Sequence, residues 1–137
     1  MDGAIQSFVA GIPFLLTHFG ITVIILVVGV FIYMKITSHD EMALIKEGNT
    51  AAAVSLSGAI LGLALPLAVC MANSVNAYDI IIWGVVALLI QLITFWIIDL
   101  WLRGLSERIE KGEVGTAILL VSVKLAVACV NAAAVSG

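Results

Sequence analysis

Four long apolar stretches, separated by three short polar segments, dominate the pattern of residues along the chain. They cover residues 12–34, about 50–71, 80 to about 101, and 114 to 135. Each is close to the ~20 apolar residues that an α-helix needs to cross the hydrocarbon core of a bilayer. The pattern therefore predicts an all-α membrane protein with four transmembrane helices, and it places Pro13 in the first turn of the first helix.

The polar segments between the spans are too short to hold a second domain. In the first, Ser38 and Glu41 match the S-x-x-E capping box, which predicts a short surface helix that ends near Gly48. The second, residues 72–79, is a turn. The third is expected to continue the preceding span as a polar helical extension that ends at Gly112. Residues 1–137 are therefore predicted to form a single integral membrane domain.

Composition supports a membrane protein and argues against other classes. Charged residues make up 11 % of the chain and the mean hydropathy is +1.23, whereas soluble domains have roughly 25 % charged residues. Basic residues are not clustered as nucleic-acid binding requires. The sequence has no metal-ligand spacing and no nucleophile or phosphate-binding motif. We expect no enzyme activity, no metal and no cofactor.

The distribution of Lys and Arg predicts the orientation. Five of the six lie in the first and third polar segments: Lys35, Lys46, Arg103, Arg108 and Lys111. Because short cytoplasmic loops of membrane proteins are enriched in Lys and Arg, these two segments should be cytoplasmic. Both termini would then lie outside, in the periplasm of a bacterial inner-membrane protein.

A weak internal repeat has an offset of 64 residues. Residues 48–54 (GNTAAAV) align with residues 112–118 (GEVGTAI), and Gly20 aligns with Gly84. Each half, about 11–72 and about 75–137, contains two spans. Because two is an even number, the halves are predicted to be parallel hairpins of the same orientation, related by a pseudo-two-fold axis along the membrane normal.

The order of three segments resembles the YjfL-like bacterial inner-membrane family, a domain-of-unknown-function family (DUF three-fifty) built from a duplicated two-helix unit. The segments are GNTAAAVSLSGAILG, WGVVALLIQL and LSERIEKGEVGTA, and the similarity covers nearly the whole chain from Lys35 onward. The resemblance implies a small multi-pass inner-membrane protein in an envelope-related setting. It implies no reaction and no catalytic residues.

Lys124 is the most unusual residue of the four spans. It lies ten residues from Val114, about 15 Å into the bilayer, where a lysine must face protein or water. Gln91 and Gly62, whose carbonyl Pro66 frees from its helix bond, are expected at the same depth. They predict a polar cluster at the midplane with no carboxylate nearby. This cluster either locks the packing or lines a permeation or binding site.

Three further sets of residues are candidates for function. Glu113, Lys124 and Asn131 share one face of the fourth helix, and His18 is expected near the depth of Asn131. Gly58 and Gly62 form a G-x-x-x-G that favours close helix packing, within the monomer or between copies. A charged collar of alternating sign, spaced for i,i+4 ion pairs, is either solvated or a docking surface: Asp99, Arg103, Glu107 and Lys111.

Two classes of function remain open from the sequence. One is a non-enzymatic, oligomeric membrane module with an envelope-stress or partner-anchoring role, favoured by the resemblance and the charged collar. The other is a small ion or solute channel or transporter whose pathway follows the Lys124 face. Under either class of function, the partners of the protein would include the lipid bilayer and other copies of the same chain.

Overall fold

The computed structural model describes residues 1–37 and 40–136, and over these residues it is all-helical. Four helices are long and apolar enough to cross a membrane. They are α1 (Asp2–Ile36), α3 (Thr50–Asn73), α4 (Ala77–Trp101) and α6 (Val114–Ser136). Two short helices, α2 (Glu41–Lys46) and α5 (Arg103–Glu110), complete the described part of the chain. The prediction of an all-α protein with four membrane-spanning helices is confirmed.

Polar side chains cap the helices where the hydrophobic pattern begins. The side chain of Asn49 accepts a hydrogen bond from the Ala52 N–H at the start of α3, and that of Asp40 accepts from the Ala43 N–H at the start of α2. Each bond satisfies a donor that the first helical turn leaves unpaired. The predicted short helix is therefore present with Asp40 as its cap, and Ser38 of the expected capping box lies outside the described residues.

The turns that precede α3 and α6 have the same backbone geometry. Gly48 and Gly112 are both at φ 89°, a left-handed conformation that glycine adopts without steric cost. Each also donates its N–H to a carbonyl three residues back, at 2.9 Å, on Ile45 and Ile109 respectively. These two glycines are 64 positions apart, which is the offset of the sequence repeat.

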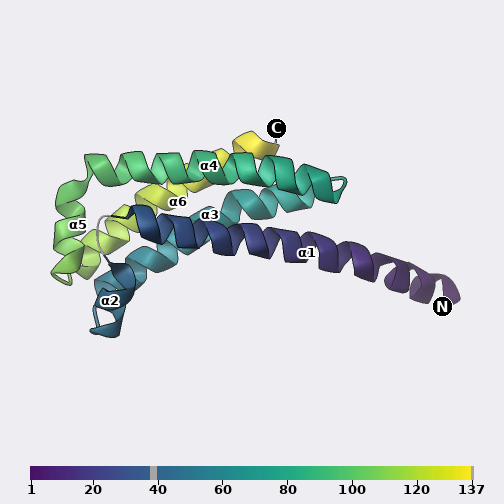
Figure 1. The fold of residues 1–137 in the computed structure, drawn as a ribbon, viewed down its shortest axis with the longest axis horizontal. Coiled ribbons are helices and arrows are strands. Elements are labelled where there is room, and N and C mark those ends of the chain that lie inside the picture. Colours follow the sequence, from purple (N-terminus) through teal and green to yellow (C-terminus); the bar gives the residue numbers. More distant parts are fainter. Residues whose placement is uncertain (38–39, 137) are drawn as a thin grey trace.

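Helix α3 lies at the centre of the bundle, where it packs most extensively on α6 and also contacts α1 and α4 (Figure 1). Small residues allow the close approach. A Cβ placed on Gly58 would lie 2.4 Å from a methyl carbon of Val121 in α6, and one on Gly62 would lie 2.7 Å from the Phe95 ring of α4. The G-x-x-x-G is thus used for packing within the chain, and the buried Pro66 follows it inside α3.

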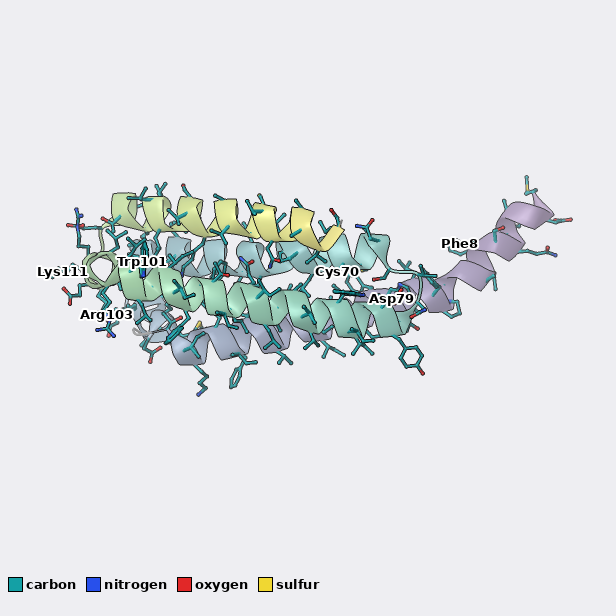
Figure 2. All side chains as sticks on the ribbon, turned by 90° about the horizontal axis from the view of Figure 1, so that it is seen from above. Phe8, Cys70, Asp79, Trp101, Arg103 and Lys111 are labelled. Carbon is teal, nitrogen blue, oxygen red and sulfur yellow. The ribbon has the colours of Figure 1, made fainter. Side chains whose placement is uncertain are left out.

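Helix α1 is longer than predicted. It begins at Asp2, not near residue 12, so that Pro13 lies inside it and not in its first turn. Its N-terminal part projects beyond the other helices, and Phe8 marks this part in Figure 2. Residues 2–12 contain no proline that would stop a helix, so the helix extends on the N-terminal side of the point where the purely apolar pattern starts.

The expected straight extension of the third span is wrong. Helix α4 ends at Trp101, and Leu102, at φ −111° and ψ 36°, breaks the helix. Helix α5 then turns across the end of the bundle (Figure 1). Ile109 is fully buried and packs in one cluster with Ala52 and Ala117. Burial of this apolar side chain favours the turned helix, because a straight extension would leave Ile109 without this packing.

Candidate functional site: two buried polar clusters

Lys124 of α6 is buried in a cluster of groups from α1 and α4. Its Nζ forms an ion pair with Oδ1 of Asp99 at 2.9 Å and donates a hydrogen bond to the hydroxyl of Tyr33 at 2.6 Å. The same nitrogen lies 4.7 Å from the centre of the Tyr33 ring and 5.2 Å from that of Phe95. These groups supply the ammonium with a counter-charge, an acceptor and two aromatic faces. We call Lys124, Asp99 and Tyr33 the lysine cluster, which the Phe95 ring borders.

The expectation that no carboxylate lies near Lys124 is wrong, and the direction of the side chains explains why. Side chains of a helix lean toward its N-terminus. Helices α4 and α6 run in opposite directions (Figure 1), so Asp99 and Lys124 lean toward each other. The lean and the length of the lysine close an axial separation that Cα positions alone made about 12 Å.

Gln91 does not join Lys124 but pairs with Asn131. The Nδ2 group of Asn131 donates to Oε1 of Gln91 at 2.9 Å and to the carbonyl of Ala87 at 3.3 Å. We call Gln91 and Asn131 the amide pair. Gln91 is fully buried, and its Nε2 has no hydrogen-bond partner among the described residues. An unpaired donor in an apolar interior carries a desolvation cost of roughly 1–3 kcal/mol.

Phe95 separates the two clusters. On α4 it is one helical turn from Gln91 and one turn from Asp99, so all three lie on one face. Its ring is fully buried, packs edge-on against Tyr33 at 5.9 Å, and fills the space beside Gly62. The structure therefore brings Gly62 to Phe95 rather than to Lys124, and the predicted single midplane cluster is divided in two.

A buried carboxylate that the sequence reasoning missed extends the lysine cluster. Glu41 begins α2 but is only 3 % exposed, and its Oε1 accepts a hydrogen bond from the buried Ser55 hydroxyl at 3.5 Å. The carboxylates of Glu41 and Asp99 both interact electrostatically with Tyr33. Both acidic residues lie at the border of an apolar stretch, and this position is the signal that could have identified them.

Two cavities open on opposite ends of the bundle. A cavity of about 550 Å³ lies at the end where Cys70 and Asp79 are labelled in Figure 2, and Asn131 forms part of its wall. A second, of about 330 Å³, is lined by Glu41 together with Thr37 and Asp40. The larger cavity thus reaches Asn131 of the amide pair, and the smaller one reaches the buried Glu41.

The other predicted site residues lie apart from these clusters. His18 stacks on Phe14 at 3.7 Å and lines a third cavity with Asn76, with no contact to Asn131 in the described part of the chain. Glu113 is exposed and does not share the buried face of Lys124. A hydrogen bond from Thr116, and the nearby Arg108 guanidinium that also bonds it, lower the pKa of the Glu113 carboxyl.

The charged collar is divided by the break at Leu102. Asp99 faces Lys124, while Arg103, Glu107 and Lys111 are exposed on α5 and its C-cap, and no ion pair joins these three in the described residues. Figure 2 shows Arg103 and Lys111 at the end of the bundle opposite Asp79. The turn at Leu102 separates Asp99 from Arg103, and none of the predicted i,i+4 ion pairs is formed among the described residues.

Four membrane-length helices around two buried polar clusters define a small multi-pass membrane protein. A family model described as Domain of Unknown Function (DUF350) matches residues 7–135, and the chain belongs to this family. The chain is 39 % identical over 116 residues to the UPF0719 inner membrane protein YjfL of Escherichia coli (strain K12), covering 85 % of this chain and 88 % of that protein. The protein of the same name from Escherichia coli O157:H7 matches equally. No solved structure matches.

These comparisons confirm the resemblance seen in the sequence. Together with the four apolar helices, they support a multi-pass protein of the inner membrane.

Proposed function

We propose that this protein is a non-enzymatic, homo-oligomeric inner-membrane module that anchors a protein partner at the end of the bundle formed by α2 and α5. The observation that carries the proposal is the surface of α5. Arg103, Glu107, Arg108, Glu110 and Lys111 are exposed there with alternating sign. Charges of this kind contribute to partner choice and association rate more than to the stability of a monomer.

The position of α5 supports this role because the helix is fixed to the bundle. Its residues Ser106 and Ile109 are buried. The side-chain amide of Asn49 donates to the carbonyls of Ile109 at 3.0 Å and Glu110 at 3.2 Å. A surface held in this way loses little conformational entropy when a partner binds.

The finer features of the proposal come from the sequence. Positive charges at the α2/α5 end favour a cytoplasmic position for that end and periplasmic termini. The shared closing geometry of Gly48 and Gly112 favours two parallel repeated hairpins. An envelope-stress role rests on the family resemblance alone. Labelling of cysteines introduced at Asp2 and Glu47 tests the orientation, and accessibility of Asp2 from the cytoplasm would contradict it.

Site-specific cross-linking in cells tests the partner surface. A photo-reactive residue at Gly104 should yield a discrete cross-linked product, and reversal of charge at Arg103 and Glu107 should abolish it. The same reversal at Asp2, at the far end of α1, is the matched control and should leave the product unchanged. A product that persists in the double reversal would show that the collar is merely solvated.

A second candidate function is a small ion channel or transporter, and the lysine cluster favours it. Ionisable residues inside membrane helices are costly and commonly mark ion pathways, and Lys124 is 1 % exposed. Ion flux in liposomes that contain the purified protein tests this candidate. Under the first proposal the lysine cluster is a packing lock, and the wild-type protein conducts nothing.

A further inference from the structure

The two buried polar clusters and the two cavities lie in one order through the bundle. From the α2/α5 end, the smaller cavity reaches Glu41, which is bonded to Ser55 and interacts with Tyr33. The lysine cluster follows, and the amide pair and the larger cavity at the opposite end complete the series. Phe95 lies between Asp99 and Gln91 on α4 and interrupts the series there.

We propose that these groups form a proton path through the bundle that the Phe95 ring closes, with Glu41 and the Lys124–Asp99 pair on one side of it and the Gln91–Asn131 pair on the other. The proposal rests on the second candidate function and makes it specific, since it names the proton as the conducted species and Phe95 as the closing group.

The chemistry of the groups favours protons over other ions. A metal cation would meet the ammonium of Lys124, and an anion would meet the carboxylates of Glu41 and Asp99. A proton needs no site of its own, because it is carried in the O–H and N–H bonds of the groups themselves. It can bind to the Asp99 carboxylate while Lys124 remains an ammonium, and the Tyr33 hydroxyl can accept one proton while it releases its own. No bond other than O–H or N–H forms or breaks.

The polar groups in contact with Lys124 come from two helices. Helix α1 contributes the Tyr33 hydroxyl and α4 contributes the Asp99 carboxylate, while Glu41 of α2 interacts electrostatically with Tyr33. Helix α3 supplies only the Ser55 hydroxyl, which does not titrate in the accessible range. The Asp99 carboxylate is therefore the acceptor in direct contact with Lys124, and Glu41 lies further along, bonded to Ser55.

The distance between Gln91 and Asp99, which Phe95 now fills, is short enough for a chain of a few water molecules to cross. Gln91 and Asp99 are eight residues apart on α4, about 12 Å, and Lys124 and Asn131 are seven apart on α6, about 10 Å. About three waters at hydrogen-bond spacing span the larger part of that distance. Water enters a buried space only where polar groups bind it. The unpaired Nε2 of Gln91 is such a group at one end of the gap, and Asp99 is one at the other.

Proton flux into vesicles tests the proposal. The purified full-length protein is placed in phosphatidylethanolamine–phosphatidylglycerol vesicles that contain a pH-sensitive dye, and valinomycin with a potassium gradient sets the potential. Phe95→Ala should raise the proton flux about tenfold or more over wild type. Phe95→Leu, which keeps an apolar side chain of similar bulk, should stay at the wild-type rate.

A second change separates a specific path from a leak. Adding Asp99→Asn to Phe95→Ala, in a double variant that remains monodisperse, should return the flux to the wild-type rate, because the carboxylate that receives the proton is gone. Flux that survives this change, or passage of a co-trapped sulfonated dye, would overturn the proposal. Phe95→Val keeps more of the core and serves if Phe95→Ala does not yield a monodisperse protein. A folded Phe95→Ala or Phe95→Val variant that conducts no more than wild type would also overturn it.

The outcomes distinguish this inference from the functions proposed above. Flux of another ion through wild type, unchanged by Phe95→Ala, would retain the channel candidate and reject the closed proton path. Loss of the α5 cross-link without any change in proton flux concerns the partner surface alone.

Discussion

The lysine cluster and the amide pair lie about 10 Å apart in one bundle, yet they satisfy their polar groups to different degrees. Lys124 has an ion pair, a hydrogen bond and two aromatic faces. Gln91 has one hydrogen bond to its oxygen and an unpaired nitrogen. An unpaired charge in a membrane interior costs far more free energy than an unpaired amide. The first cluster should therefore tolerate change poorly and the second well.

The largest effect is expected from breaking the ion pair on its acidic side. Asp99→Asn leaves the ammonium of Lys124, which is 1 % exposed, without a counter-charge. The free energy of unfolding should fall by about 3–5 kcal/mol, as for other buried pairs that lose one partner. Lys124→Met should cost less, because the 15 % exposed side chain of Asp99 can be hydrated or take up a proton. Unfolding in mixed micelles measures both, and the reverse order would contradict the account.

A smaller effect is expected at the boundary between the clusters. In Gly62→Ala, the new methyl group would lie 2.7 Å from Cζ of Phe95, so that the ring must shift. Overpacking of this kind typically costs about 1–3 kcal/mol. The same substitution at Gly20, which has no atom within 4 Å of the added carbon, is the control and should leave the free energy of unfolding unchanged or slightly raised.

The amide pair should be less sensitive. Gln91→Leu removes the bond from Asn131 but also removes the unpaired nitrogen, and Asn131 retains the carbonyl of Ala87. The two contributions oppose each other, so the free energy of unfolding should change by no more than about 1 kcal/mol. Asn131→Leu leaves all of Gln91 unpaired and should cost more. Equal losses in the two variants would show that the amide pair acts as a single unit.

The smallest effect on the free energy of unfolding is expected at Glu113, which is a carboxylate like Asp99 but is exposed at the surface. The pKa of Glu113 is lowered in the folded protein by Thr116 and Arg108. Its contribution to stability is therefore present above the pKa of the unfolded chain, near 4.3, and is lost as the pH falls through the lower folded value. The unfolding midpoints of wild type and Glu113→Gln should differ slightly at pH 7 and converge in acid. A difference that grows as the pH falls would contradict this sign.

The helices could be predicted from the sequence, but the partners of the polar residues could not. Hydropathy located four spans because a bilayer requires about 20 apolar residues per helix. Lys124 was identified for the same reason, since a charge is conspicuous in such a span. Asp99 was assigned to the surface because it lies two residues before the end of its helix, and only the opposing lean of two side chains brings it to Lys124.

Two other departures from the prediction have the same origin in tertiary packing. The turn between α4 and α5 follows from the burial of Ile109 against α3 and α6, which no pattern within residues 99–111 reveals. The burial of Glu41 depends on Ser55, fourteen positions away. Local propensity gave the helix α2 correctly, while its first residue turns inward because of a helix that follows later in the chain.

A double-mutant cycle on Asp99 and Lys124 tests most directly whether these residues form one buried pair. The free energies of unfolding of Asp99→Leu, Lys124→Met and the double variant are measured in mixed micelles. If the two sites are independent, the losses of the single variants add up to the loss of the double variant. If the pair exists as described, the double variant should be more stable than the Asp99→Leu single variant, with a coupling energy of about 2 kcal/mol. Losses that add to within about 0.5 kcal/mol would show that Lys124 is stabilised by something other than Asp99.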